Sequence, residues 1–149
     1  YEILNESEID ITLSLINKTA TRIPEAMWFS FDPIISNPAG WEMDVLGHKV
    51  NPTDVMTDAS QRYHAVWNGI SYKEKNEEKL HIHSRHVPLV IVENIDRFIT
   101  PEVNTPSTIK NGMHFNLNNN LWNTAFPLWS IENPDGTRTL NHKFKITLN

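Results

Sequence analysis

Asparagine and tryptophan side chains gather between residues 118 and 123, where the sequence reads NNNLWN. An indole ring can stack on the weakly positive C–H face of a sugar, and amide groups can hydrogen-bond its hydroxyls without any net charge. Asparagine also tolerates left-handed backbone, so the same run can serve as an irregular connection in a core hairpin. Two interpretations follow: a structural connection, or a sugar-facing loop at Asn118–Asn123 with Trp122 as platform and Asn119, Asn120 and Asn123 as polar partners.

A second aromatic and polar pair, His64 and Trp67, could line a ligand groove. A regular strand places residues three apart on opposite faces, so a shared site here would require a bulge. The alternative is a pair of core side chains in which the imidazole is hydrogen-bonded. We retain both as candidate ligand-binding residues.

Three histidines follow in the pattern H-x-H-x-x-H, at His81, His83 and His86. On a strand the first two share a face and could reach one metal ion, whereas the third requires the strand to bend. The positive charge of Arg85 beside them disfavours a bound cation, and edge-strand or surface histidines explain the pattern. We therefore predict no metal site and no cofactor in this chain.

Catalytic signatures are missing from the sequence. Hydrolysis of a glycosidic bond needs a pair of carboxylates, and no two acidic residues stand out by context as such a pair. The sequence has no cysteine, which excludes a thiol nucleophile and a thiolate zinc site, and it has no nucleophile elbow or phosphate-binding loop. We expect a chain that is not catalytic on its own.

The length, charge and hydropathy of the sequence limit the kinds of partner that the chain can bind. The 149 residues suit one domain, and we expect a single domain over 1–149 that forms the C-terminal part of a larger protein. A formal charge of −5 without a basic stripe argues against nucleic acid, and no apolar run is long enough to span a membrane. The sequence leaves the compartment open, with an extracellular or periplasmic location favoured.

Short strands must position these side chains. Residues 7–16 alternate apolar and polar with a period of two, which predicts a half-buried antiparallel strand that forms a meander with residues 26–31. Asn68-Gly69 lies between two apolar runs, and this dipeptide is the strongest short-range signal of a hairpin. Further strands are predicted at residues 88–92, 113–117, 126–131 and 143–148. Many short strands and turns without helical periodicity predict an all-β fold, an antiparallel β-sandwich.

Three short motifs carry a resemblance. Together, in order and spacing, they are similar to the C-terminal region of an uncharacterised family of large proteins. The N-terminal part of those proteins resembles glycoside hydrolase family 38, the α-mannosidase-like enzymes. The matching residues are Pro24–Trp28 with Ser30 and Phe31; Arg62–Trp67 with Gly69; and His114–Leu117, Asn119, Asn120, Trp122, Thr124, Phe126, Pro127 and Trp129.

The resemblance implies a β-sandwich of the kind that ends family 38-like enzymes. It also implies a partner, the N-terminal catalytic domain of the same protein, on which this domain packs while contributing a sugar-facing loop. The alternatives are an autonomous, lectin-like carbohydrate-binding module and a purely structural assembly domain.

Overall fold

The computed structural model describes residues 1–19, 25–54, 56, 63–92, 109, 112–120 and 137–149. These residues form β-strands, turns and a short 3-10 helix at Pro38–Gly40, and within them the all-β prediction is confirmed. The strands are β1 (Glu2–Asn5), β2 (Glu8–Thr19), β3 (Glu25–Phe31), β4 (Trp41–Val45), β5 (His48–Val50), β6 (Tyr63–Ala65), β7 (Ile70–Glu74), β8 (Glu77–Ser84), β9 (Leu89–Val92), β10 (Met113–Asn120) and β11 (Thr137–Leu148).

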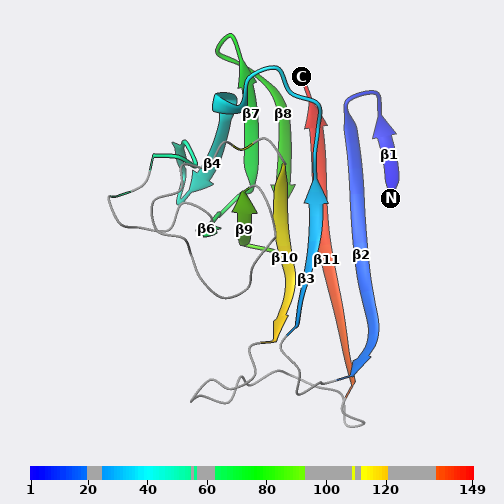
Figure 1. The fold of residues 1–149 in the computed structure, drawn as a ribbon. Helices are drawn as coiled ribbons and strands as arrows, with labels where there is room; N and C mark the ends of the chain where they lie inside the picture. Colours follow the sequence, from blue (N-terminus) through cyan, green and yellow to red (C-terminus); the bar gives the residue numbers. More distant parts are fainter. Residues whose placement is uncertain (20–24, 55, 57–62, 93–108, 110–111, 121–136) are drawn as a thin grey trace.

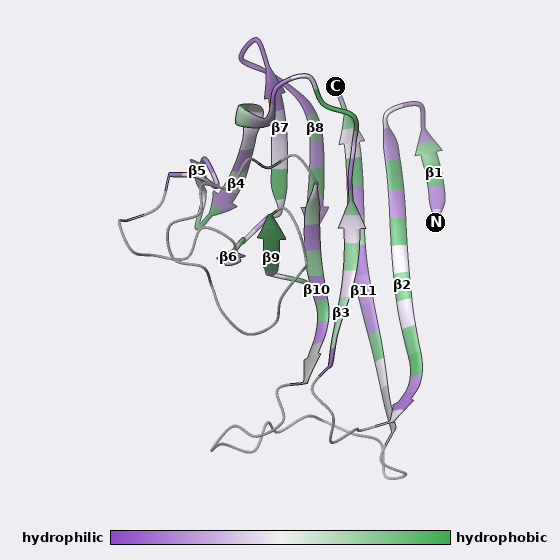
Figure 2. Ribbon diagram, viewed as in Figure 1, coloured by the Kyte–Doolittle hydropathy of each residue, from purple (hydrophilic) through white to green (hydrophobic). Residues whose placement is uncertain are grey.

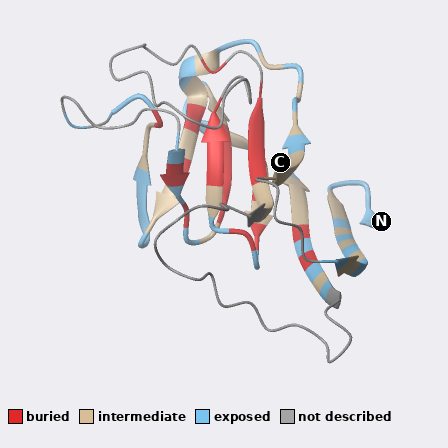
Figure 3. Cartoon of the chain, turned by 60° about the horizontal axis from the view of Figure 1, so that its bottom comes forward, coloured by how far each residue is buried: buried red, intermediate tan, exposed pale blue. Residues whose placement is uncertain are grey.

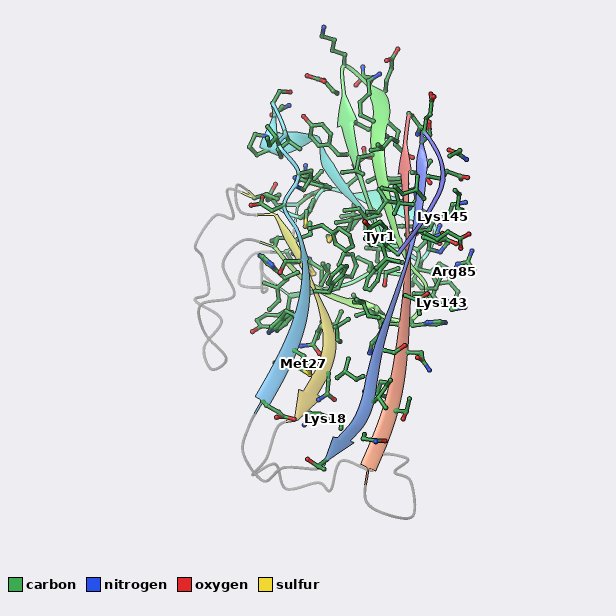
Figure 4. The ribbon with its side chains drawn as sticks, turned by 90° about the vertical axis from the view of Figure 1, so that its right-hand side faces the viewer. Tyr1, Lys18, Met27, Arg85, Lys143 and Lys145 are labelled. Atoms are coloured by element: carbon green, nitrogen blue, oxygen red, sulfur yellow. The ribbon has the colours of Figure 1, made fainter. Side chains whose placement is uncertain are left out.

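Within the described residues the strands make two antiparallel sheets (Figure 1). The larger has the order β1-β2-β11-β8-β7-β4-β5, and the smaller has the order β3-β10-β9-β6. Seen from the side, β3 and β10 form one layer and β2 and β11 form the other (Figure 4). This two-layer arrangement is consistent with the predicted β-sandwich.

Aromatic rings join the two layers. Phe144 of β11 lies 5.3 Å from Phe29, 5.5 Å from Phe31 and 5.2 Å from Phe115, measured between ring centroids. Phe29 and Phe31 belong to β3 and Phe115 belongs to β10, so the contacts cross from the larger sheet to the smaller. Tilted and edge-to-face pairs at these separations contribute about 0.5–1.5 kcal/mol each beyond their burial. The buried residues concentrate on the central strands, whereas β1 is exposed along its length (Figure 3).

The alternating prediction for residues 7–16 is confirmed by β2, which reaches Thr19 (Figure 2). Ile11 and Leu13 turn toward the core, while the intervening Thr12 is exposed. The short apolar run at residues 88–92 is also confirmed, because β9 buries Val90, Ile91 and Val92. The final predicted strand, 143–148, forms the second half of a longer β11.

Two predicted strand pairings are wrong. β2 and β3 do not form a meander, since β2 pairs with β1 and β11 while β3 pairs with β10 in the other sheet. Asn68-Gly69 does not close a hairpin either, because β6 and β7 belong to different sheets. Gly69 has a φ of +101°, and a Cβ there would overlap the carbonyl oxygen of Ile82. The dipeptide therefore serves a close crossing between sheets instead of a two-residue turn.

None of the described helical segments is long and apolar enough to cross a bilayer.

Candidate functional site

The motif-bearing segments gather in the four-stranded sheet. β3 and β10 pair along their length, with His114 opposite Ser30 and Asn116 opposite Trp28. β6, which carries Tyr63–Ala65, pairs with β9 in the same sheet. Segments that lie far apart in the sequence are thus brought onto one layer.

The side of this sheet that faces away from the core carries a cross-strand polar and aromatic row. Phe29 and Phe115 point into the core, so their neighbours along the two strands point outward. The Nδ1 atom of His114 lies 2.7 Å from the Ser30 hydroxyl, and His114 is buried. One step along the ladder, the ring N–H of Trp28 and the amide nitrogen of Asn116 are buried without a hydrogen-bond partner among the described residues.

These four residues are motif positions in the sequence, and sequence reasoning did not place them in a site. Ser30 and His114 stand 84 positions apart in the chain, so only the β3–β10 register reveals the pair. The available signal was the alternation of apolar with polar or indole residues at 28–31 and 113–116. The pair can orient the imidazole, because a hydroxyl bonded to one ring nitrogen fixes the tautomer and leaves the other nitrogen to a second partner.

His64 and Trp67 occupy different environments. His64 lies on β6 and is buried with 9% of its surface exposed, while Trp67 lies in the bend after β6 and is 74% exposed. The prediction of opposite faces assumed one regular strand through both residues, but β6 ends at Ala65, so the different exposure of Trp67 does not test that alternation. Of these two residues, Trp67 is therefore the accessible candidate.

A rigid frame presents Trp67. Its backbone N–H donates to the carbonyl of Asp44 at 2.7 Å, and the N–H of Asp44 donates to the carbonyl of Gly69 at 3.1 Å. The Asp44 carboxylate accepts from the N–H of Gly47 at 2.9 Å, which closes the β4–β5 turn beside it. Nε2 of His81 lies 3.3 Å from the carbonyl of Asn68. Trp67 thus projects from a bend that is held on both sides, as a stacking platform requires.

The prediction of a loop over the Asn-rich run is wrong for Asn118, Asn119 and Asn120. These residues continue β10 opposite Met27, Ala26 and Glu25. A register shift between Asn116 and Asn118 inserts one extra residue, and asparagine suits such a bulge because it accepts unusual backbone angles. Residues 121–136, which include Trp122, Asn123 and the predicted strand at 126–131, lie outside the described residues.

The three histidines of the H-x-H-x-x-H pattern do not lie on one element. His81 and His83 share a face of β8, with ring centroids 6.0 Å apart, and His86 lies in the bend beyond the strand. Nδ1 of His81 is 3.5 Å from the Glu78 carboxylate. Burial lowers the pKa of His83, and the nearby charges of His81, Arg85 and Lys145 lower it further. Among the described residues no group of three or more His, Cys, Asp or Glu side chains could hold a metal ion.

No family model, curated protein or solved structure matches this chain.

Proposed function

We propose that this chain is a non-catalytic β-sandwich domain of a larger enzyme that resembles glycoside hydrolase family 38, and that it packs on the catalytic domain of that enzyme. The motif resemblance supplies the enzyme class. The observation that carries the packing role is an apolar part of the larger sheet that the smaller sheet leaves open. We call it the β1–β2 face and define it by Ile3, Ile9 and Leu148.

The β1–β2 face lies beyond the edge of the second layer. β3 is the edge strand of the smaller sheet and packs over β11 through Phe29 and Phe31. β2 and β1 extend past β3 (Figure 1). Ile3 is 65% exposed and Leu148 is 45% exposed, although both lie on strands of the sheet. A neighbouring domain that covers them would gain about 1–2 kcal/mol at Ile3 and less at Leu148, because only the exposed fraction of each side chain remains to be buried.

The edge of β3 away from β10, which has no partner among the described strands, adds backbone groups to this surface. Among the described strands β3 pairs only with β10, so the hydrogen-bonding groups on its other edge have no strand partner there. Exposed edges invite pairing with another strand, and proteins usually cover or protect them. An apolar face next to a strand edge that no described strand pairs with suits a neighbouring domain that contributes both side chains and backbone.

The test compares Ile3→Ser in the parent protein and in the isolated chain. In the parent we expect the 149-residue domain to be released by limited proteolysis at least about tenfold faster, because one buried isoleucine contributes roughly the free energy of a factor of ten in an equilibrium. In the isolated chain the melting temperature should move by no more than about 2 °C, since Ile3 is already exposed.

Ile16→Ser is the matched control, because Ile16 is 70% exposed and lies on β2 away from the β1–β2 face. Equal release of the domain by both variants would show that general loss of apolar surface is responsible and would remove the support for packing at this face. A parent protein in which the domain moves independently of its neighbour would overturn the proposal outright.

A second candidate function, an autonomous carbohydrate-binding module, is favoured by Trp67. An exposed indole on a bend fixed by the backbone of Asp44 is the arrangement that stacks on a sugar ring. This function places the sugar at Trp67, which the sequence offered as a groove residue, and not at Trp122, which the sequence offered as the stacking platform.

Isothermal titration calorimetry of the isolated chain against the best ligands of a glycan array distinguishes the two functions. Sugar binding that Trp67→Ala abolishes and Ile34→Ala preserves would establish the module, because Ile34 is fully exposed in a different loop. Sugar binding that survives in Trp67→Ala would exclude Trp67 as the platform. A folded wild-type chain that binds no sugar would leave packing on the catalytic domain as the one supported function.

A further inference from the structure

A groove opens on the opposite side of the larger sheet from the core. Its volume is about 280 Å³, and strands β1, β2 and β11 line it together with the bend after β8. Arg85, Lys143 and Lys145 point to this side, away from β3 and β10 (Figure 4). The volume is close to the lower end of the range for small-molecule pockets, about 300 Å³, which suits a ligand the size of one sugar unit.

The register of the sheet gives the groove a cationic end. Lys143 lies opposite Thr12 on β2, and the N–H of Arg85 donates to the carbonyl of Lys143 at 3.2 Å. Neither Arg85 nor Lys143 forms an ion pair with any described residue. The guanidinium of Arg85, the ammonium of Lys143 and the hydroxyl of Thr12 are therefore available to one ligand.

The other end of the groove is acidic. Asp10 lies opposite Glu2 on β1 and opposite Lys145 on β11. Lys145 is neutralised by Glu8, whose carboxylate lies 2.6 Å from the Lys145 Nζ atom. The hydrogen bond from Lys145 lowers the pKa of Glu8, and a hydrogen bond from Asn5 lowers it further. Asp10 and Glu2 thus remain as acceptors at this end.

We propose that this groove binds a monoanionic hydroxy-carboxylate of the uronic acid class. The planar fork of Arg85 matches a carboxylate, while Lys143 and Thr12 supply a point charge and a further donor. Thr12 and Asp10 are two residues apart on β2, about 7 Å, which is the span from the carboxylate to the distal hydroxyls of one sugar acid. Those hydroxyls donate to Asp10 and Glu2, which repel any second negative charge.

This inference does not rest on the proposed packing role, because it concerns the other side of the sheet and a different set of residues. It also differs from stacking at Trp67, since charge recognition at Arg85 and Lys143 requires an acid and stacking does not. The groove would therefore distinguish an acidic sugar from a neutral one.

The test is an NMR titration of the isolated chain, following backbone amide shifts, with glucuronate, glucose, acetate and inorganic phosphate as separate probes. Glucuronate should saturate with shifts centred on Thr12, Arg85 and Lys143. The three other probes should each bind at least about tenfold more weakly, because glucose lacks the charge, acetate lacks the hydroxyls and phosphate is repelled by the acidic end.

Variants separate the two ends. Arg85→Ala combined with Lys143→Ala should weaken glucuronate binding at least about tenfold, whereas Lys75→Ala, in the exposed β7–β8 turn, should leave it unchanged. Asp10→Asn should weaken glucuronate and strengthen phosphate, a reversal that loss of folding cannot produce. Binding of phosphate or acetate as tight as that of glucuronate would overturn the proposal, as would the absence of saturable glucuronate binding.

Discussion

One row of side chains crosses the inner face of the larger sheet and changes from exposed to buried along its length. Strand register connects it in the order Ile3, Ile9, Ile146, Ile82, Ile70 and Met43. Ile3 is 65% exposed at one end, while Ile82, Ile70 and Met43 are at most 2% exposed at the other. Five of the six are isoleucines, so residue type does not explain the difference.

The difference follows from the second layer. The smaller sheet ends at β3, which packs on β11 through Phe29 and Phe31, and it does not reach β1 (Figure 1). The covered half therefore supplies the core, while the overhanging half presents the same kind of surface to its surroundings. A period of two predicts which side of a strand is apolar, and the reach of the partner sheet decides whether that side is buried.

The largest expected effect tests the covered half. Phe115 is fully buried, with its ring 5.7 Å from Phe31 and 5.2 Å from Phe144. Phe115→Ala should lower the free energy of unfolding by about 3–5 kcal/mol, since it removes a large side chain and leaves a cavity. Ile3→Ala should change it by no more than about 0.5 kcal/mol.

Urea unfolding followed by tryptophan fluorescence measures the free energy of unfolding of Phe115→Ala and Ile3→Ala. A change in the midpoint without a change in the slope of free energy against urea concentration identifies a pure stability effect. Similar losses for the two substitutions would contradict the contrast between the covered and overhanging halves.

The next prediction compares two glycines with positive φ. Gly69→Ala would bring a Cβ against the Ile82 carbonyl oxygen, whereas a Cβ at Gly47 meets nothing within 4 Å. We expect Gly69→Ala to cost at least about 2 kcal/mol, and Gly47→Ala to cost about 1 kcal/mol from backbone strain alone. Thermal unfolding of both variants measures the difference. Equal costs would mean that the crossing at Gly69 relaxes and does not hold Trp67 in place.

The sequence predicted much of the local structure of these strands. The alternation of β2 and the apolar run of β9 depend on neighbouring residues, and both are confirmed. Strand partners depend on segments far apart in the chain, and there the local signals failed. Asn68-Gly69 carries the composition of a hairpin turn, yet β6 and β7 enter different sheets.

The candidate site shows the same contrast between what neighbouring residues predict and what depends on pairing between distant strands. Spacing by three suggested that His64 and Trp67 do not share a site, but their separation in the structure follows from the end of β6 at Ala65, which the local sequence did not predict. No spacing could join Ser30 to His114, since their contact depends on the register between β3 and β10. The composition of Asn118–Asn120 predicts a loop because asparagine is common in turns, while the place of this run in β10 is set by pairing with β3.

The smallest expected effect concerns a histidine on the inner side of β11. His142 is buried opposite Leu13, and neither of its ring nitrogens has a hydrogen-bond partner among the described residues. Burial lowers its pKa below the ordinary value of 6.5, and the charge of His86 lowers it further. Well above pH 6.5 both folded and unfolded chains carry the neutral ring, so the site contributes no pH dependence there.

As the pH falls below 6.5, the unfolded chain takes up a proton that the folded chain resists, so the free energy of unfolding decreases until the pH reaches the folded pKa. His142→Gln should therefore flatten this decrease, by at most about 1.4 kcal/mol per pH unit. Urea unfolding at several pH values from neutral to mildly acidic measures the slope, with the exposed His48→Gln as control. A slope that is the same in His142→Gln and wild type would assign the acid sensitivity to other groups, of which His83 is the first to examine because burial lowers its pKa as well.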